Sequence, residues 1–219
     1  MAVIKVAVYE VDGVEYDVPT EYDLITAIND VGIDTVGTEA TLGWNDIVAD
    51  IVIRGSGPNS PSWSLFRNGI YGYSFSATAI QECWLSYHIR HDYALGTAFF
   101  PHIHFATNTT NTGTVRFGFE YTIAKGYNQG TASEFGVSTI EYLEFPITAN
   151  AQYRHLIAEN TLGILSAKLE PDAVILARAF RDADHPNDTF PSPIFIFNVD
   201  VHYQVDRTTT INKNPNFYA

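Results

Sequence analysis

The stretch from Gly96 to Ile123, GTAFFPHIHFATNTTNTGTVRFGFEYTI, constrains the fold of this chain more than any other. Two runs with a period of two, over 99–106 and 115–122, flank a segment rich in Asn, Thr and Gly. A period of two is typical of strands, and the intervening residues are typical of turns. We therefore predict a long β-hairpin over 96–123, which needs a second sheet to cover its apolar face.

The rest of the chain supplies further strands separated by turn signals. We expect them near 47–54, 63–66, 69–77, 82–91, 138–147, 155–159, 162–169, 173–181 and 193–207. Strands of this number and spacing are typical of an antiparallel sandwich or barrel. The absence of internal sequence repeats argues against a propeller or a solenoid. The fold class is predicted to be all-β, an antiparallel β-sandwich of the jelly-roll type.

The sequence divides into three predicted parts. Around Asp12-Gly13, a favoured turn pair, the first residues form a hairpin, and 21–31 has apolar residues at helical spacing. The last residues contain too few apolar side chains to fold alone, and we expect them to dock along a neighbouring subunit. The parts are an N-terminal hairpin-helix arm or docking subdomain (1–38), the sandwich (39–207) and a C-terminal tail (208–219).

The charge of the chain restricts its partners. There are 25 acidic and 12 basic residues, a formal net charge of −13. Such a surface repels phosphates and anionic lipids, so we expect neither direct nucleic-acid binding nor membrane binding. No apolar run is long enough to span a bilayer and no secretory signal is recognised, so we expect synthesis in a cytoplasm. The single cysteine, Cys83, excludes an intrachain disulfide and is predicted to be a buried thiol.

His102 and His104 are the candidate metal ligands. Side chains two residues apart on a strand project the same way, about 7 Å apart, and imidazole nitrogens bind transition metals. If the strand 193–207 pairs beside the hairpin, His202 or Glu120 is a candidate third ligand. The alternative is that both histidines are half-buried strand residues hydrogen-bonded to their neighbours. No other cofactor is expected.

Two known arrangements contain a similar His-x-His pattern. Gly96, followed after five residues by His102 and His104, resembles the opening of the first cupin motif, which implies a metal-dependent enzyme. The glutamate that the cupin pattern then requires is replaced by Asn108 and Thr109. The pattern also resembles trimeric phage fibres, in which strands of three chains bind one metal on their common axis.

The sequence contains no recognisable catalytic motif. A Gly-x-Ser-x-Gly elbow, a P-loop and a dinucleotide fingerprint are all missing. Two acidic pairs, Glu141/Glu144 and Asp182/Asp184, are explained as solvated strand faces and loop residues. We therefore predict that the protein is not an enzyme and has no catalytic residues.

Three aromatic residues beside the Pro- and Gly-rich loop, Trp63, Tyr71 and Tyr73, are candidates for an interface or for glycan binding. Exposed aromatic rings stack on sugar rings and are enriched at interfaces. The alternative is that they belong to the core.

Residues 44–207 resemble virion structural proteins of tailed bacteriophages. The matching segments are WND (44–46), GSGPNSPSW (55–63), PHIHF (101–105), FEYTIAKG (119–126), AVILARAFRDADHPNDTF (173–190) and FNVDVHYQVDR (197–207). The resemblance implies a non-enzymatic jelly-roll protein of the virion, foremost a head-decoration (cement) protein that bridges shell subunits. Its partners would be the major capsid protein or other virion proteins and its own copies, as a homotrimer. The alternative is a tail or fibre component that binds host-surface glycan. Residues 1–38 lie outside the resemblance.

Overall fold

The computed structural model describes residues 8–11, 14–17, 42–54, 57–128, 132–206 and 209–217. The chain divides into two compact units, 1–41 and 42–219. In the first unit, β1 (Val8–Val11) and β2 (Val14–Asp17) pair antiparallel, which confirms the predicted N-terminal hairpin. The helix predicted over 21–31 lies outside the described residues.

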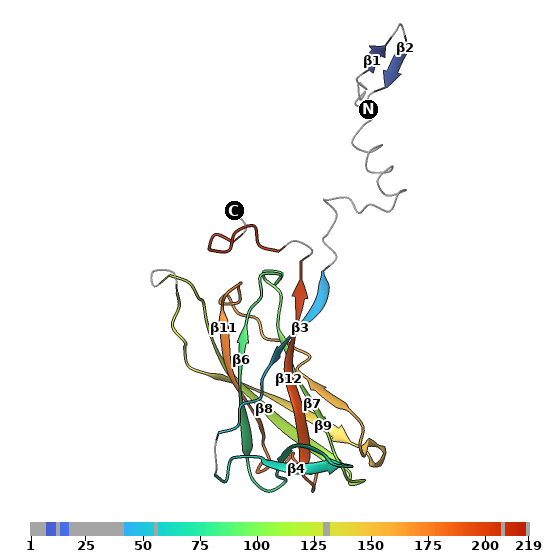
Figure 1. The fold of residues 1–219 in the computed structure, drawn as a ribbon, viewed down its shortest axis with the longest axis vertical. Helices are drawn as coiled ribbons and strands as arrows, with labels where there is room; N and C mark the ends of the chain where they lie inside the picture. Colours follow the sequence, from blue (N-terminus) through green and yellow to red (C-terminus); the bar gives the residue numbers. More distant parts are fainter. Residues whose placement is uncertain are drawn as a thin grey trace. The chain divides into compact units, whose positions relative to one another are not determined.

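The second unit is an antiparallel β-sandwich, which confirms the predicted fold class (Figure 1). One sheet has six strands: β3 (Gly43–Ala49), β4 (Ser62–Arg67), β5 (Ile70–Phe75), β7 (Phe100–Ala106), β10 (Leu156–Glu159) and β12 (Ile194–Val205). The other has four: β6 (Gln81–His88), β8 (Gly113–Ala124), β9 (Thr139–Ile147) and β11 (Val174–Arg181). A short 3-10 helix, η1 (Ala149–Ala151), precedes β10.

The strand order is that of a jelly roll. The order β10-β7-β12-β5 in the larger sheet faces β6-β11-β8-β9, so that most connections cross from one sheet to the other. The long strand β12 organises the larger sheet: β7 pairs with one edge, and β5 and then β3 pair with the other. Between Ile196 and Asn198 the register with β7 shifts at a bulge. Bulges re-aim the side chains that follow them.

The predicted hairpin over 96–123 is wrong. Its two arms are β7 and β8, and they lie in opposite sheets. Their apolar faces meet across the sandwich, where the rings of Phe105 and Phe117 are 5.1 Å apart. Pairing the arms side by side would have left both apolar faces on one side of a single sheet. Facing each other, the arms bury those faces mutually.

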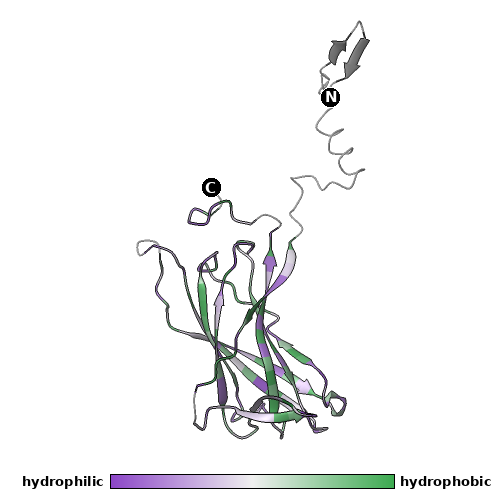
Figure 2. Cartoon of the chain, viewed as in Figure 1, coloured by the Kyte–Doolittle hydropathy of each residue, from purple (hydrophilic) through white to green (hydrophobic). Residues whose placement is uncertain are grey.

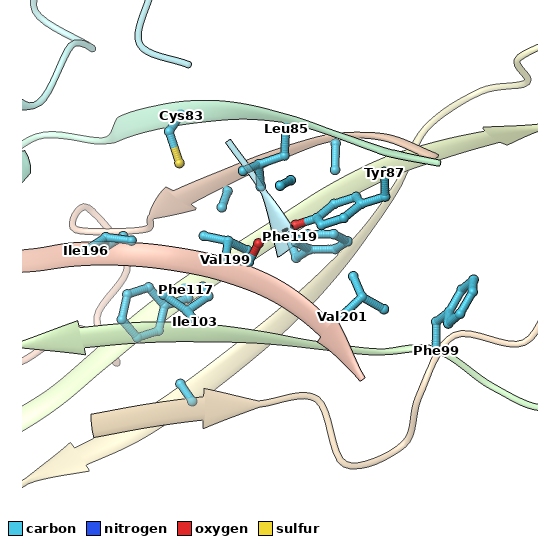
Figure 3. Close-up of a cluster of buried hydrophobic side chains, with 14 of the residues drawn as sticks. Cys83, Leu85, Tyr87, Phe99, Ile103, Phe117, Phe119, Ile196, Val199 and Val201 are labelled. Atoms are coloured by element: carbon cyan, nitrogen blue, oxygen red, sulfur yellow. Dashed lines mark hydrogen bonds between the residues drawn. The ribbon is translucent and has the colours of Figure 1, made fainter. Parts of the chain in front are cut away.

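The core lies between the two sheets and consists of side chains at alternating strand positions. Figure 2 shows hydrophobic and hydrophilic residues alternating in the middle of β12, after a hydrophobic start. In the close-up of Figure 3, side chains of β6 and β8 point toward those of β7 and β12; among them are Leu85, Tyr87, Ile103, Phe117, Phe119, Val199 and Val201. The hydroxyl of Tyr87 donates to the carbonyl of Val199 at 3.0 Å, so this buried polar group is satisfied.

Cys83 is buried in this core, as predicted, and its thiol is expected to be unreactive. Burial raises the pKa of the Cys83 thiol to about 12, and the thiolate is the nucleophilic form. Ellman's reagent at pH 8 should therefore label no thiol in the native protein and one per chain in guanidinium. Rapid stoichiometric labelling of the native protein would contradict this.

Gly118 is required where β8 passes under the ring of Phe180. The two residues are directly opposite each other on β8 and β11, and a Cβ on Gly118 would lie 2.1 Å from Cζ of Phe180. The ring is itself held by Tyr142 and by the guanidinium of Arg178. We expect Gly118→Ala to lower the free energy of unfolding by about 1–3 kcal/mol, measured by urea denaturation.

Gly136 provides the matched control. A Cβ there meets only Nζ of Lys168, at 3.8 Å, so Gly136→Ala should change the free energy of unfolding by less than about 0.5 kcal/mol. Equal effects of the two substitutions would show that the contact with Phe180 is not what requires the glycine.

Two other expectations differ from the structure. Residues 162–169 form no strand but only an isolated bridge from Ile164 to Phe99, since Gly163 has a φ of 71°, far from strand geometry. The tail folds back on its own sandwich: the amide of Thr210 donates to the carbonyl of His91 at 3.1 Å, and the buried ring of Phe217 packs on the same histidine.

Among the residues that the structure describes, none forms a helix long and apolar enough to cross a membrane.

Candidate functional site

The outer face of the six-stranded sheet carries a strip of histidines and carboxylates. Ile103 of β7 and Val201 of β12 face the core. Side chains alternate along a strand, so the residues on either side of each point outward: His102 and His104 on β7, and Asp200 and His202 on β12. The register places His102 of β7 directly opposite Asp200 of β12. The strand 193–207 thus does pair beside the first arm of the predicted hairpin.

Three of these side chains, His102, His104 and Asp200, converge and form what we call the His–Asp cluster. Oδ2 of Asp200 lies 3.3 Å from Nε2 of His104 and 3.8 Å from Nε2 of His102. The cluster is largely shielded from solvent, since the side chains of His102, His104 and Asp200 are 1%, 18% and 9% exposed. Their ligand atoms all lie within 4.8 Å of one another.

Burial shifts the pKa of each side chain in the cluster. It lowers the pKa of His102, with a further decrease from neighbouring His202, and it lowers the pKa of His104, with a further decrease from His155. Burial also raises the pKa of Asp200, against the attraction of His102. The neutral imidazoles, the form that binds metal ions, are therefore favoured.

His202 lies beside the cluster but is held by other partners. Its Nε2 is 3.0 Å from Oδ1 of Asp46 on β3, and its Nδ1 is 2.5 Å from Oε1 of Glu159 on β10. Its ring stacks on that of His102, with 3.8 Å between the centroids. His202 therefore connects β3, β12 and β10 across the outer face of the sheet.

A cleft of about 520 Å³ adjoins His202 on the same face, and we call it the Trp44 cleft. Trp44 is 59% exposed, and its ring packs edge-on against that of Phe100, with 5.5 Å between the centroids. The lining residues are Trp44, Phe100, Glu159, Thr161 and His202. The cleft thus combines an apolar wall with a carboxylate, a hydroxyl and an imidazole.

The aromatic candidates Trp63, Tyr71 and Tyr73 lie on β4 and β5, outside the lining of this cleft. Trp63 and Tyr71 are 63% and 50% exposed. Tyr73 is half-buried and packs against the Trp63 ring at 4.8 Å.

Glu120 is wrong as a third ligand. It lies on β8 in the opposite sheet, where Nη2 of Arg178 is 2.6 Å from its carboxylate and the hydroxyl of Ser138 donates to it. One member of each predicted acidic pair is also ion-paired: Glu144 and Asp182 both bind the guanidinium of Arg116.

The sequence reasoning missed Trp44, Asp46, His155 and Glu159 as members of this face. Asp46 and Glu159 belong to strands that pair with β12 and β7, respectively. Alternation along a strand shows which of its own residues lie on one face. Only the strand order shows which strands place residues on the same sheet face as His102.

Comparisons with protein-family models and with curated proteins find no match. Among solved structures, the chain is similar to the carbohydrate-binding module TmCBM61, in a complex with β-1,4-galactotriose. That alignment has 10% identity and a TM-score of 0.28, and it covers 77% of this chain and 91% of the other. A protein of unknown function, SO2946 from Shewanella oneidensis MR-1, aligns with 11% identity and a TM-score of 0.22, covering 89% and 98% of the two chains. Both likenesses are too weak to support an inference about function.

Proposed function

We propose that this protein is a non-enzymatic carbohydrate-binding β-sandwich whose Trp44 cleft binds a neutral oligosaccharide. The observation that carries the proposal is an exposed tryptophan in a cleft of about 520 Å³, a volume typical of small-ligand sites. The apolar face of a sugar ring packs on an aromatic ring, and Trp44 offers such a ring with more than half of its surface free.

The polar lining of the cleft fits sugar hydroxyls. The carboxylate of Glu159 accepts hydrogen bonds, and the hydroxyl of Thr161 both donates and accepts them. Two carboxylates, Asp46 and Glu159, flank His202, and the chain as a whole carries a net charge of −13. These charges disfavour sulfated or phosphorylated glycans, so the proposed ligand is uncharged.

The experiment is a glycan array with the full chain, followed by isothermal titration calorimetry with the oligosaccharides it retains. Trp44→Ala should weaken binding at least about tenfold, a loss of about 1.4 kcal/mol. Trp63→Ala is the matched control, because Trp63 is equally exposed but lies on β4, outside the cleft.

The two variants distinguish the Trp44 cleft from a glycan site at the β4–β5 edge. Loss of binding in Trp63→Ala with normal binding in Trp44→Ala would move the glycan site to the β4–β5 edge. No binding to any neutral glycan on the array would overturn the proposal.

The second candidate is the head-decoration role in a bacteriophage virion. It is favoured by the division of the chain into units 1–41 and 42–219, because a small separate unit is suited to attach a sandwich to a shell of major capsid subunits. Docking of residues 209–217 on their own sandwich speaks against a tail that reaches a neighbour. This role predicts a homotrimer in size-exclusion chromatography with light scattering, and a monomer at all concentrations would contradict it. A tail or fibre location fits the glycan proposal equally well.

A further inference from the structure

We propose that Nε2 of His102, Nε2 of His104 and the carboxylate of Asp200 together bind one divalent first-row transition metal ion within a single chain. Two imidazoles and a carboxylate are a donor set that zinc accepts, and zinc is the probe that we would use. This proposal is independent of the proposed glycan site, because none of the three residues lines the Trp44 cleft.

Two buried atoms of the cluster lack partners. Nε2 of His104 and Oδ1 of Asp200 are shielded from solvent and have no hydrogen-bond partner among the described residues. Nε2 of His104 lies 3.3 Å from Oδ2 of Asp200, but the geometry of this contact is not that of a hydrogen bond. Buried polar atoms are nearly always paired, and the exceptions need an explanation. A bound cation would supply the missing partner to Nε2 of His104, and it would do the same for Oδ1 of Asp200 if the carboxylate bound through that oxygen or through both oxygens.

The contacts of the Nδ1 atoms bear on whether the Nε2 atoms of His102 and His104 carry a hydrogen. Nδ1 of His102 faces the backbone carbonyl of Phe100 at 3.4 Å. A carbonyl only accepts, so the hydrogen of neutral His102 belongs on Nδ1, and its Nε2 keeps a lone pair.

His104 has a comparable neighbour. Its Nδ1 lies 2.7 Å from Nε2 of His155. When His104 is the donor in this pair, its Nε2 is bare. Metal-binding histidines commonly donate from their other ring nitrogen in this way. In that tautomer, two lone pairs and a carboxylate converge with no hydrogen between them, which is favourable around a cation and unfavourable without one.

The distances from the Asp200 carboxylate to the two histidines are close to those of a small coordination sphere. Two ligands bound to zinc at tetrahedral angles lie about 3.3 Å apart. The distance from Asp200 to His104 has this value, and the 3.8 Å from Asp200 to His102 requires a shift of a few tenths of an ångström.

A second set of donors on this face, Asp46, His102 and His202, is disfavoured. Both ring nitrogens of His202 already face carboxylates, at 3.0 and 2.5 Å, so His202 offers no unpartnered nitrogen. The unpartnered atoms belong to the set that contains His104 and Asp200.

The test is isothermal titration calorimetry of the full, EDTA-treated chain with zinc chloride. We expect one zinc ion per chain, and visible absorption bands of low-symmetry Co²⁺ when cobalt replaces zinc. His104→Gln and Asp200→Asn keep the size of each side chain, and each should weaken zinc binding at least about 100-fold. Circular dichroism melts of the apo variants show whether the fold is retained.

The matched control is His88→Gln. His88 and His91 also flank a carboxylate, with nitrogens 3.3 and 3.1 Å from Oδ1 of Asp172, so they form a second His–Asp group on the same chain. Zinc binding should be unchanged in this variant. The proposal is overturned if the wild-type chain binds no zinc, if folded Asp200→Asn binds it normally, or if His88→Gln alone removes it.

Discussion

Replacing Asp188 with alanine is expected to lower the free energy of unfolding by about 3–5 kcal/mol. Asp188 is the counterion of Arg181, and the two side chains are 1% and 0% exposed. The guanidinium donates to both carboxylate oxygens, at 2.7 and 2.9 Å, and to the carbonyls of Phe190 and Ser192. The substitution would leave a buried cation without its charge partner. Urea denaturation of the full chain measures the effect.

Asp184→Ala is the control for that substitution. It removes a carboxylate from the same loop at an exposed position, and the change should stay within about 0.5 kcal/mol. If Asp188→Ala cost no more than Asp184→Ala, the ion pair could not be what fixes the loop between β11 and β12.

Phe117→Ala is the second substitution with a large expected effect, also about 3–5 kcal/mol of unfolding free energy. Phe117 is fully buried on β8 and packs against Phe105 of β7, so its ring joins the two sheets. Removing it leaves a cavity in the centre of the sandwich. Urea denaturation again provides the measurement.

Phe135→Ala removes the same ring from an exposed position and should change the unfolding free energy by less than about 0.5 kcal/mol. A small effect of Phe117→Ala would indicate that β7 and β8 do not meet across the core. Such a result would favour the side-by-side hairpin that the sequence suggests.

Alternation in the sequence predicted which residues share a face. It placed His102 and His104 on one face of a strand, and it placed Cys83 in the core. The structure agrees at each of these positions. A period of two determines the face because it follows from the geometry of a single strand.

Alternation does not determine which strands are neighbours. The polar loop after Ala106 suggested a hairpin, whereas the chain crosses there to the opposite sheet. This error matters for the site. A hairpin would have placed β8 and Glu120 beside His102, but the strands beside β7 are β12 and β10, which bring Asp200 and Glu159.

The candidate site also depends on details that no local pattern reveals. The bulge between Ile196 and Asn198 sets the register in which Asp200 faces His102. Asp46 comes from β3, far away in the sequence, and reaches His202 because β3 pairs with β12 in a register that places the two residues opposite each other. The contact between His104 and His155 likewise comes from tertiary structure.

The central claim is that the outer sheet face of each chain holds its own metal ion. The most direct test is native mass spectrometry of the full chain after incubation with zinc and removal of the excess. We predict one zinc ion per chain, whatever the number of chains in the oligomer that is detected. A spectrum that shows only zinc-free protein would contradict the claim. One ion for every three chains would place His102 and His104 on a threefold axis instead.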